Sequence, residues 1–509
     1  MKKIPVLALC VSLVSCVFVS RRVDIEPVSA RSPVAVSSPV KAHLKDGSVI
    51  VYPDGVTVTA DSLSGPGTRH DVTRVHSTAV DTIALSEVIG MESYRTKVNR
   101  GETFLVSTLA TVGGLVGSAA LAVAVFGSCP TVYSEDGIVE EAELFSSSVA
   151  PLFEGRDTDR LQTRADASGL VSLEVRNEAM ETHYLNHLQL LEVTHAEDER
   201  VIPDARGGAM AVSGLHPALV ATNRQGADIG PLLQAADGRY YLTNREALEA
   251  ASTADMEDWI DLSIPVQKPA TSVALVFRMR NSLLNTILLY DVMLGPSGAA
   301  ALDWLGTGLG KISTAVELGR WHQRRAGLHI SVWQDGAYHE VERIPDSGPI
   351  SWHEVASKIP VPPGETNLRV RLTYLTDHWR IDRLAVSFAA RTPVTQTIPL
   401  TGVEGRDGAA DEKALENMRA ADEKYLQTNP GDRFVARFRA APPRGATRTF
   451  LLSSQGYYTE WIRGSWLQKA IATEPFVPSD DAVLTAMRKW GETRDSFEQR
   501  FLQARVPVR

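Results

Sequence analysis

One short segment holds the densest group of side chains that could bind a metal ion. Glu181, His183 and His187 offer carboxylate and imidazole groups, which are the usual oxygen and nitrogen ligands of zinc. His183 and His187 stand four residues apart, a spacing that aligns two side chains only on a helix. The pattern instead favours a turn between strands at 173–176 and 188–193, and neither HExxH nor CxxC accompanies it. The three residues are therefore metal candidates only if the segment is helical, and a turn held by side-chain hydrogen bonds is the alternative.

No motif in the chain indicates a catalytic residue or a cofactor. The glycine-rich stretch 306–311 ends in lysine, but the Walker pattern needs a glycine where this chain has Leu305 and a hydroxyl residue where it has Ile312. A GxSxG nucleophile motif is absent, and Cys129 is the only cysteine outside the N-terminal apolar run. Glycosidase carboxylates leave no local signature, so a hydrolase of that kind stays open as the alternative.

Aromatic residues supply the candidate ligand-binding positions. Trp352 follows a Ser-Gly-Pro turn, which makes it the aromatic least typical of a core. Tyr457 and Trp461 lie in a segment dense in aromatics, which is typical of either a seam between domains or a partner-binding site. The other aromatics considered are Trp333, Tyr338 and Trp379.

The N-terminus has the features of an export signal. Two lysines precede an apolar run at 4–19, and two arginines follow it. Within the run, the tetrapeptide LVSC ending at Cys16 resembles the lipobox of bacterial lipoproteins, which implies lipidation of Cys16. An uncleaved anchor helix is the alternative. Residues 23–40, rich in Pro, Ser and Val, are expected to form an extended tether.

A second apolar segment divides the chain. Residues 104–126 hold no charged residue, and a helix of that length rises about 35 Å, close to the thickness of a bilayer core. Basic residues before it and acidic residues after it predict an orientation opposite to that of a lipoprotein. We therefore expect the helix at 103–127 to be membrane-associated without spanning, and the body to lie outside the cytoplasm. A buried helix of a soluble core is the alternative.

The motifs after this helix resemble a known family. SCPxVY ends at Tyr133, and NExxETxY runs from Asn177 to Tyr184. Together with the lipobox, their order resembles an uncharacterised family of bacterial envelope lipoproteins over about residues 104–210. The resemblance implies an envelope location and no particular activity.

Composition and charge narrow the class of protein. An apolar share of 44% and a charged share of 22% are ordinary for globular chains. The net charge of −9 provides no basic footprint, so nucleic acid is not an expected partner. Three cysteines, two of them in the N-terminal apolar run, exclude a disulfide framework within the chain.

Alternating apolar residues and Asp-Gly turns predict a mainly β fold. Residues 255–390 also resemble jelly-roll modules of the galactose-binding kind, which often bind glycans through exposed aromatics. The predicted regions are a signal and lipobox (1–22), a tether (23–40), a small β-barrel or meander (41–102), an apolar membrane-type helix (103–127), a β-rich domain (128–250), a jelly-roll-like β-sandwich (251–400) and a mixed α/β region (401–509) that ends in a helix from Asp480 to Gln503.

These observations predict a membrane-anchored envelope lipoprotein whose body is periplasmic or extracellular. Its expected role is non-catalytic binding or scaffolding, with the lipid bilayer and an envelope protein or polysaccharide as partners. The alternative is a glycan-directed envelope hydrolase with carboxylate chemistry. An exposed aromatic strip would favour the glycan binder, whereas a pocket with two carboxylates about 5 to 10 Å apart would favour the hydrolase.

Overall fold

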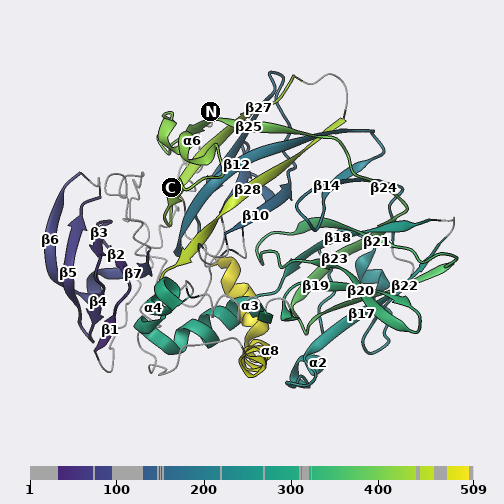
Figure 1. Cartoon of the computed structure of the whole chain (residues 1–509), viewed down its shortest axis with the longest axis horizontal. Coiled ribbons are helices and arrows are strands. Elements are labelled where there is room, and N and C mark those ends of the chain that lie inside the picture. Colours follow the sequence, from purple (N-terminus) through teal and green to yellow (C-terminus); the bar gives the residue numbers. More distant parts are fainter. Residues whose placement is uncertain are drawn as a thin grey trace, which may run out of the picture.

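The computed structural model describes the greater part of the chain. The described residues are 33–72, 75–94, 130–145, 148, 151, 154–217, 220–266, 270–308, 311, 320–321, 324–442, 447–462, 479–503 and 508. Cys16 and the predicted helix at 103–127 lie outside these ranges. Of the helices that the structure describes, none is both long and apolar enough to cross a membrane. The prediction of a mainly β fold with a few helices is confirmed, because half of this part of the chain forms strands, arranged in five sheets (Figure 1).

The N-terminal sheet curls into the small barrel-like body at the left of Figure 1. Gly47 and Gly55 sit in its predicted turns with φ of 84° and 86°, a conformation that favours glycine. The first strand begins at Val34, so the end of the predicted tether 23–40 belongs to this sheet. The strands are β1 (Val34–Val36), β2 (Val40–Leu44), β3 (Val49–Tyr52), β4 (Val56–Val58), β5 (Ser62–His70), β6 (Ser77–Ala84) and β7 (Val88–Ser93), in the order β1-β4-β5-β3-β2-β7 with β6 on β5.

A nine-stranded sheet joins two parts of the chain that are far apart in sequence. Its long strands β12 (Glu181–His195) and β28 (Thr447–Glu460) pair antiparallel from end to end. The remaining strands are β8 (Thr131–Ser134), β9 (Val139–Glu143), β10 (Gly155–Arg160), β11 (Leu170–Arg176), β25 (Thr395–Glu404), β26 (Leu426–Thr428) and β27 (Arg433–Arg439).

The sheet order differs from the predicted division of the chain. Residues 128–250 and 401–509 were expected to form separate regions, but both contribute strands to this one sheet. The boundary predicted at 401 falls inside β25 (Thr395–Glu404), which pairs with β12 on one side and β27 on the other. Local sequence patterns mark strands, but they do not indicate which distant strands pair.

Between these two parts, the chain builds a β-sandwich. Two antiparallel sheets enclose a core that includes Ile260, Phe277, Leu372 and Ile381, all fully buried. The four-stranded sheet contains β15 (His216–Pro217), β23 (Trp379–Ser387), β18 (Ser272–Asn281) and β21 (His353–Pro360). The five-stranded sheet contains β16 (Val220–Asn223), β17 (Glu257–Pro265), β22 (Asn367–Leu375), β19 (Leu328–Gln334) and β20 (Ala337–Ile344). A small sheet of β13 (Arg200–Pro203), β14 (Ala209–Ser213) and β24 (Ala389–Arg391) lies at the edge.

The hairpin between β19 and β20 follows the predicted turn chemistry. Asp335 and Gly336 have φ of 52° and 83°, as a two-residue turn of the primed type requires. This turn places Trp333 directly opposite Tyr338. Residue order in the hairpin therefore determines which aromatic side chains are neighbours.

In Figure 1, α2, α3, α4 and α8 lie low in the molecule, whereas α6 lies near its top. The apolar run at 283–294 is buried, and it packs with barrel residues and α8 in one hydrophobic cluster. The helix α6 ends at Met418, and the chain enters β26 at Leu426. The helical segments are η1 (Leu85–Glu87), α1 (Gly230–Leu233), α2 (Arg245–Glu249), α3 (Leu284–Thr286), η4 (Ile287–Leu294), η5 (Gly295–Ala300), α4 (Ala301–Asp303), η6 (Trp304–Gly308), α6 (Glu412–Met418) and α8 (Asp480–Gln503).

The C-terminal helix α8 (Asp480–Gln503) matches its predicted range. The buried residues on its apolar face include Met487 and Trp490. The hydroxyl of Ser479 caps the helix by accepting the N–H of Ala482.

Asp377 holds α8 against the sandwich. Its carboxylate accepts hydrogen bonds from Arg380 at 2.7 Å, from Trp490 Nε1 at 2.7 Å and from Arg494 at 3.2 Å. Asp377 and Arg380 are both fully buried, and Asp377 has φ of 60°. Each of these buried charges requires the other, because a single charge here would have neither water nor an opposite charge to stabilise it.

Replacing this carboxylate should therefore destabilise the protein. Asp377→Ala removes the buried partner of the Arg380 guanidinium and leaves it only the more exposed Glu498, and it also places alanine at a positive φ. We expect the free energy of unfolding to fall by about 3–5 kcal/mol, measured by urea denaturation followed through tryptophan fluorescence. The control is Glu416→Gln, which breaks an exposed ion pair with Lys424 and should barely move the midpoint. Equal shifts for the two variants would contradict this role of Asp377.

Candidate functional site

The three metal candidates lie in a strand, which corrects the turn predicted over 177–186. Glu181 and His183 are fully buried, and His183 Nε2 lies 2.6 Å from Glu181 Oε1. The register of β12 with β28 shifts between Leu185 and His187, so the His187 side chain does not continue the row of Glu181 and His183. Among the residues that the structure describes, no three His, Cys, Asp or Glu side chains are grouped to hold a metal ion. The backbone N–H and C=O groups of this segment pair with β28. The segment therefore forms a strand, although its polar side chains suggested a turn.

Tyr457 and Trp461 lie where the N-terminal barrel meets the nine-stranded sheet. Trp461 is 2% exposed, its ring stacks on His43 at 3.8 Å, and its Nε1 donates to the hydroxyl of Thr182 at 2.8 Å. Tyr457 stacks on Tyr184 with ring centroids 4.6 Å apart. Trp461 therefore packs between the two bodies, whereas the ring contacts of Tyr457, with Tyr184 and Tyr425, lie on the side of the nine-stranded sheet.

A buried carboxylate organises the same joint. Glu92 accepts hydrogen bonds from Lys41 at 3.3 Å and from Thr459 at 2.7 Å, and it lies 3.2 Å from His43 Nε2. Burial alone would raise the pKa of Glu92. The charges of Lys41 and His43 and the hydrogen bonds to the carboxylate outweigh burial and lower this pKa to about 2.

Two of the remaining aromatic candidates have different surroundings. Trp379 is 1% exposed and belongs to the sandwich core. Trp352 is partly exposed, but the guanidinium groups of Arg278 and Arg280 lie 5.2 and 5.1 Å from its ring centroid and Tyr240 packs beside it at 5.5 Å. Trp352 is thus enclosed by cations and another ring.

Trp333 and Tyr338 instead lie on the side of the five-stranded sheet that faces away from the sandwich core. Alternate residues of each strand point to this side, as the burial of β17 and β22 shows. The sheet register then brings side chains from all five strands into rows. This surface, the outward face, consists of Val220, Thr222, Trp259, Asp261, Ser263, Trp333, Tyr338, Asn367, Arg369 and Arg371.

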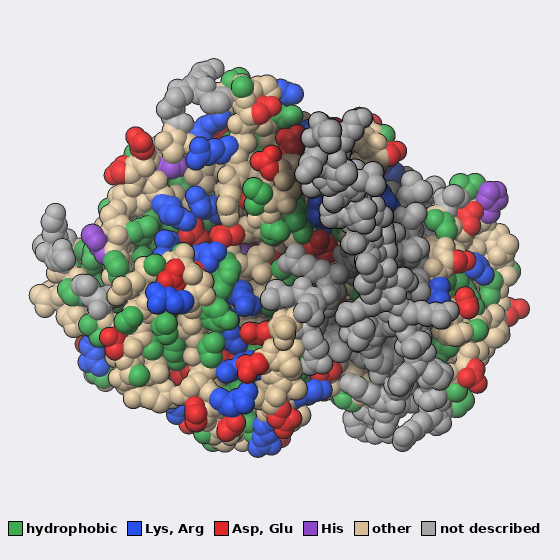
Figure 2. All heavy atoms as spheres, turned by 180° about the vertical axis from the view of Figure 1, so that it is seen from behind, with side chains coloured by type: hydrophobic (Ala, Val, Ile, Leu, Met, Phe, Trp, Pro, Cys, Tyr) green, Lys and Arg blue, Asp and Glu red, His purple; other side chains and the backbone are tan. Residues whose placement is uncertain are grey.

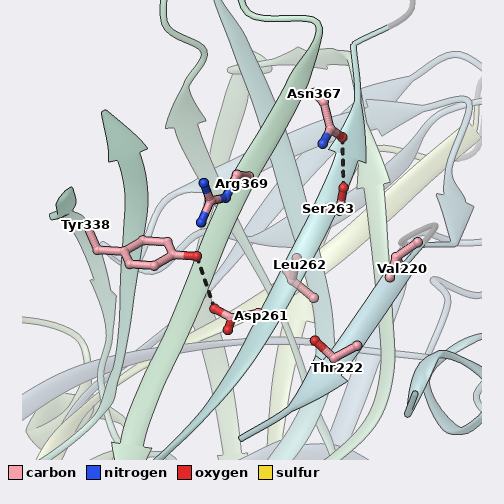
Figure 3. A pocket seen from close by; sticks show the side chains of 8 residues that line it. All are labelled: Val220, Thr222, Asp261, Leu262, Ser263, Tyr338, Asn367 and Arg369. Atoms are coloured by element: carbon pink, nitrogen blue, oxygen red, sulfur yellow. Dashed lines mark hydrogen bonds between the residues drawn. The ribbon is translucent and has the colours of Figure 1, made fainter. Parts of the chain in front are cut away.

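A pocket of about 210 Å³ opens on the outward face (Figure 3). In it, Tyr338 donates to Asp261 at 3.2 Å, and Ser263 donates to Asn367 at 2.8 Å. Arg369 lies between these two pairs in Figure 3. The lining is completed by Val220, Thr222 and Leu262. Hydroxyl, amide, carboxylate and guanidinium groups therefore line one small hollow. Polar groups of these kinds fix the orientation of a ligand in a binding site.

Arginines lie over the aromatic rings of the outward face. The Arg369 guanidinium lies 4.2 Å from the ring centroid of Trp333. Those of Arg224 and Arg371 lie 4.5 and 4.7 Å from the ring centroid of Trp259. At such distances the cation is attracted to the electron-rich face of the ring, and the ring limits the movement of the arginine.

The arginines differ in how their charge is balanced. Arg371 makes two hydrogen bonds of 2.8 Å to the two oxygens of Asp261, and these raise the pKa of Arg371. Arg224 pairs in the same forked way with Asp255. Arg369 is exposed and lies over the rings of Trp333 and Tyr338, but it takes part in none of the ion pairs found among the described residues.

Sequence reasoning found only part of this surface. It named Trp333 and Tyr338 as candidates but missed Trp259, Asp261 and Arg369. The alternation in β17 and β22 does reveal that these residues share the polar side of their strands. That β22 lies between β17 and β19, which brings Arg369 to Trp333, is a property of sheet order and has no local signal.

A second cluster of titratable groups lies where β9, β10 and β21 meet. His353 Nδ1 is 3.0 Å from Asp159, and its Nε2 is 3.6 Å from Glu143. The hydrogen bond to Asp159 and the charges of both carboxylates outweigh burial and raise the pKa of His353 to about 10. Burial and the nearby charge of Asp159 raise the pKa of Asp157, so this carboxyl holds its proton to a higher pH than an ordinary aspartate.

Charge on the rest of the surface is mixed. The view from behind in Figure 2 shows basic and acidic side chains interspersed over the part of the molecule that holds the sandwich. No single basic area dominates that view among the described residues, so nucleic acid has no evident site there.

Comparisons with known proteins identify no family. No family model matches the chain, and no curated protein matches it. Among solved structures, a GH31 α-xylosidase from Xanthomonas citri aligns over 84% of this chain and 38% of its own, at 10% identity and a TM-score of 0.14. The infectious bursal disease virus Gt strain structure aligns over 68% of this chain and 89% of its own, at 11% identity and a TM-score of 0.11. Scores this low carry no argument about function.

The joint around Glu92 should make stability depend on pH in a defined direction. The folded pKa of about 2 lies below the ordinary value of 4.5, so the stabilisation is present above pH 4.5 and is lost as pH falls toward 2. Glu92→Gln leaves Lys41 and His43 without their counter-charge. We expect it to lower the melting temperature at pH 7 but to differ much less from wild type at pH 3, measured by differential scanning calorimetry.

The matched control is Glu87→Gln, which removes a carboxylate from an exposed position nearby. It should leave the melting temperature unchanged at both pH values. A loss of stability in Glu92→Gln that is equal at pH 3 and pH 7 would show that the carboxylate charge is not the cause.

Proposed function

We propose that this chain is a membrane-anchored lipoprotein of the bacterial envelope that binds polysaccharide through the outward face. In this proposal the protein is a non-catalytic binding or scaffold component. Its lipidated N-terminus holds it to the bilayer, and its β-rich body lies in the periplasm or outside the cell.

The pocket on the outward face is the observation that carries the binding part of the proposal. Sugars offer many hydroxyl groups and need closely spaced donors and acceptors, which Thr222, Ser263 and Asn367 supply on adjacent strands. These side chains stand on paired strands rather than on loops, so their spacing is set before a ligand arrives. The volume of about 210 Å³ lies below the range of about 300–1,000 Å³ typical of drug-sized ligands, which suits one unit of a longer chain.

Sequence features support the anchoring part. A charged start, an apolar run and the LVSC tetrapeptide at Cys16 are the parts of a lipoprotein signal. A lipidated N-terminus with more than one acyl chain binds a bilayer firmly, whereas one chain gives marginal binding. The apolar segment 103–127 adds a second contact with lipid in this proposal.

A glycan-directed hydrolase is the second candidate function. The raised pKa of Asp157 favours it, because a general acid for glycoside cleavage must hold its proton near neutral pH. Against it, the one carboxylate in the pocket, Asp261, already has both oxygens bound to Arg371. Release of reducing ends from a polysaccharide, and its loss in Asp157→Asn, would favour the hydrolase over the binder.

Binding can be tested directly on the pocket. The double variant Thr222→Val/Asn367→Ala removes two hydrogen-bonding groups while keeping the strands. We expect the purified protein to bind at least one of dextran, polygalacturonate and dextran sulfate in affinity electrophoresis, and the double variant to bind it about tenfold more weakly.

The matched control is Thr397→Val/Gln396→Ala, which makes similar changes at exposed positions of β25. It should bind like wild type. Equal weakening in both double variants, or no retardation of wild type by any of the three polysaccharides, would contradict the proposal.

Lipidation of Cys16 makes a separate prediction. Cells grown with labelled palmitate should incorporate the label into this protein, and Cys16→Ser should abolish incorporation because the thiol is the attachment point. Cys10→Ser serves as the control and should keep the label. Incorporation that survives Cys16→Ser would contradict lipidation at this position.

A further inference from the structure

The aromatic rings of the outward face are already occupied. Neutral sugars commonly bind by stacking on a free aromatic face, but a guanidinium lies over Trp333 and two lie over Trp259. The ring of Tyr338 also has a guanidinium over it, that of Arg371 at 4.4 Å. A ligand on this surface would therefore meet guanidinium groups that lie over the aromatic rings, rather than exposed ring faces.

Arg369 is the arginine whose charge is available. Its neighbours are each paired with a carboxylate. Arg371 donates two hydrogen bonds of 2.8 Å to Asp261, and Arg224 donates hydrogen bonds of 2.6 and 2.8 Å to Asp255. Arg369 is exposed and lines the pocket, with its guanidinium 4.2 Å from the ring centroid of Trp333 and 5.9 Å from that of Tyr338 (Figure 3). Because the Asp261 carboxylate is neutralised by Arg371, the pocket retains one unbalanced positive charge.

The groups around Arg369 also fit an anion. The Asn367 carbonyl already accepts from Ser263 at 2.8 Å, so the amide presents its N–H₂ side as a donor. Thr222 adds a hydroxyl across the pocket. The planar guanidinium fork binds a carboxylate or a sulfate through two parallel hydrogen bonds, which gives both affinity and orientation.

We infer that the outward face binds an acidic polysaccharide, with the anionic group of one sugar unit on Arg369. This inference rests on the proposed polysaccharide binding and adds its substrate class. Trp333 and Tyr338 act as positioning residues, because the Arg369 guanidinium lies over their rings, 4.2 and 5.9 Å from the ring centroids.

The test measures binding of the full-length protein to three probes by affinity electrophoresis. Polygalacturonate carries carboxylates, dextran sulfate carries sulfates and dextran is neutral, so the three separate the kind of anion from the sugar chain. We expect at least one of the acidic probes to bind about tenfold more tightly than dextran, and its binding to weaken as salt is raised.

Variants then assign the charge to one residue. Arg369→Gln should lose about tenfold in affinity for the acidic probe, a larger loss than it shows toward dextran, and Arg369→Lys should lose less because it keeps the charge without the fork. Arg206→Gln is the control, because Arg206 is exposed and its removal changes the net charge equally outside the pocket. It should bind like wild type.

The outcomes separate the inference from the proposed function. Dextran binding as tight as that of both acidic probes would overturn the acidic class while leaving polysaccharide binding in place. Equal losses in Arg369→Gln and Arg206→Gln would overturn the role of Arg369. Absence of binding to all three probes would overturn both the inference and the proposed function.

Discussion

The pairing of β12 (Glu181–His195) with β28 (Thr447–Glu460) is the constraint on which the rest of the structure depends. These strands lie side by side over their whole length although some 250 residues separate them in sequence. The chain between them must leave the sheet and return, and it builds the sandwich on the way. The pairing also sets the ends of β12 and β28 against the N-terminal barrel, where Trp461 packs on His43.

Buried charged groups that pair with groups of opposite charge join the bodies at their contacts. Glu92 links the barrel to the nine-stranded sheet, Asp377 links α8 to the sandwich, and His353 lies between carboxylates where the nine-stranded sheet meets the sandwich. Such groups are strongly unfavourable when a partner is missing, so they favour the one arrangement that satisfies them. The joints are thus specified by polar chemistry, while the hydrophobic clusters supply most of the buried apolar area.

The outward face differs from these joints because its polar groups are open to solvent. Its rigid sheet holds each side chain at a fixed position, and ring–guanidinium contacts limit the freedom of the arginines. At a joint, the same side chains would be covered by the neighbouring body. On a free surface it leaves Arg369 available to a ligand, and this is why the face rather than the aromatic seam carries the proposed function.

Local patterns in the sequence were enough to predict most of the strands, turns and the final helix. Turn glycines such as Gly336, the alternation of β17 and β22 and the apolar face of α8 follow from backbone sterics and from side-chain periodicity, which act over a few residues. The same local reasoning misjudged residues 177–186, where polar side chains suggested a turn but pairing with a distant strand forms β12. It also placed Tyr457 and Trp461 among ligand candidates, although the seam was the alternative.

The sequence by itself determined the fold class, most strand positions and the final helix, because each of these depends on neighbouring residues. Only the tertiary structure decided that regions 128–250 and 401–509 share one sheet and that Arg369 meets Trp333 beside Asn367. Strand order depends on the free energy of the whole packed chain, so contacts between distant strands cannot be obtained from any local window.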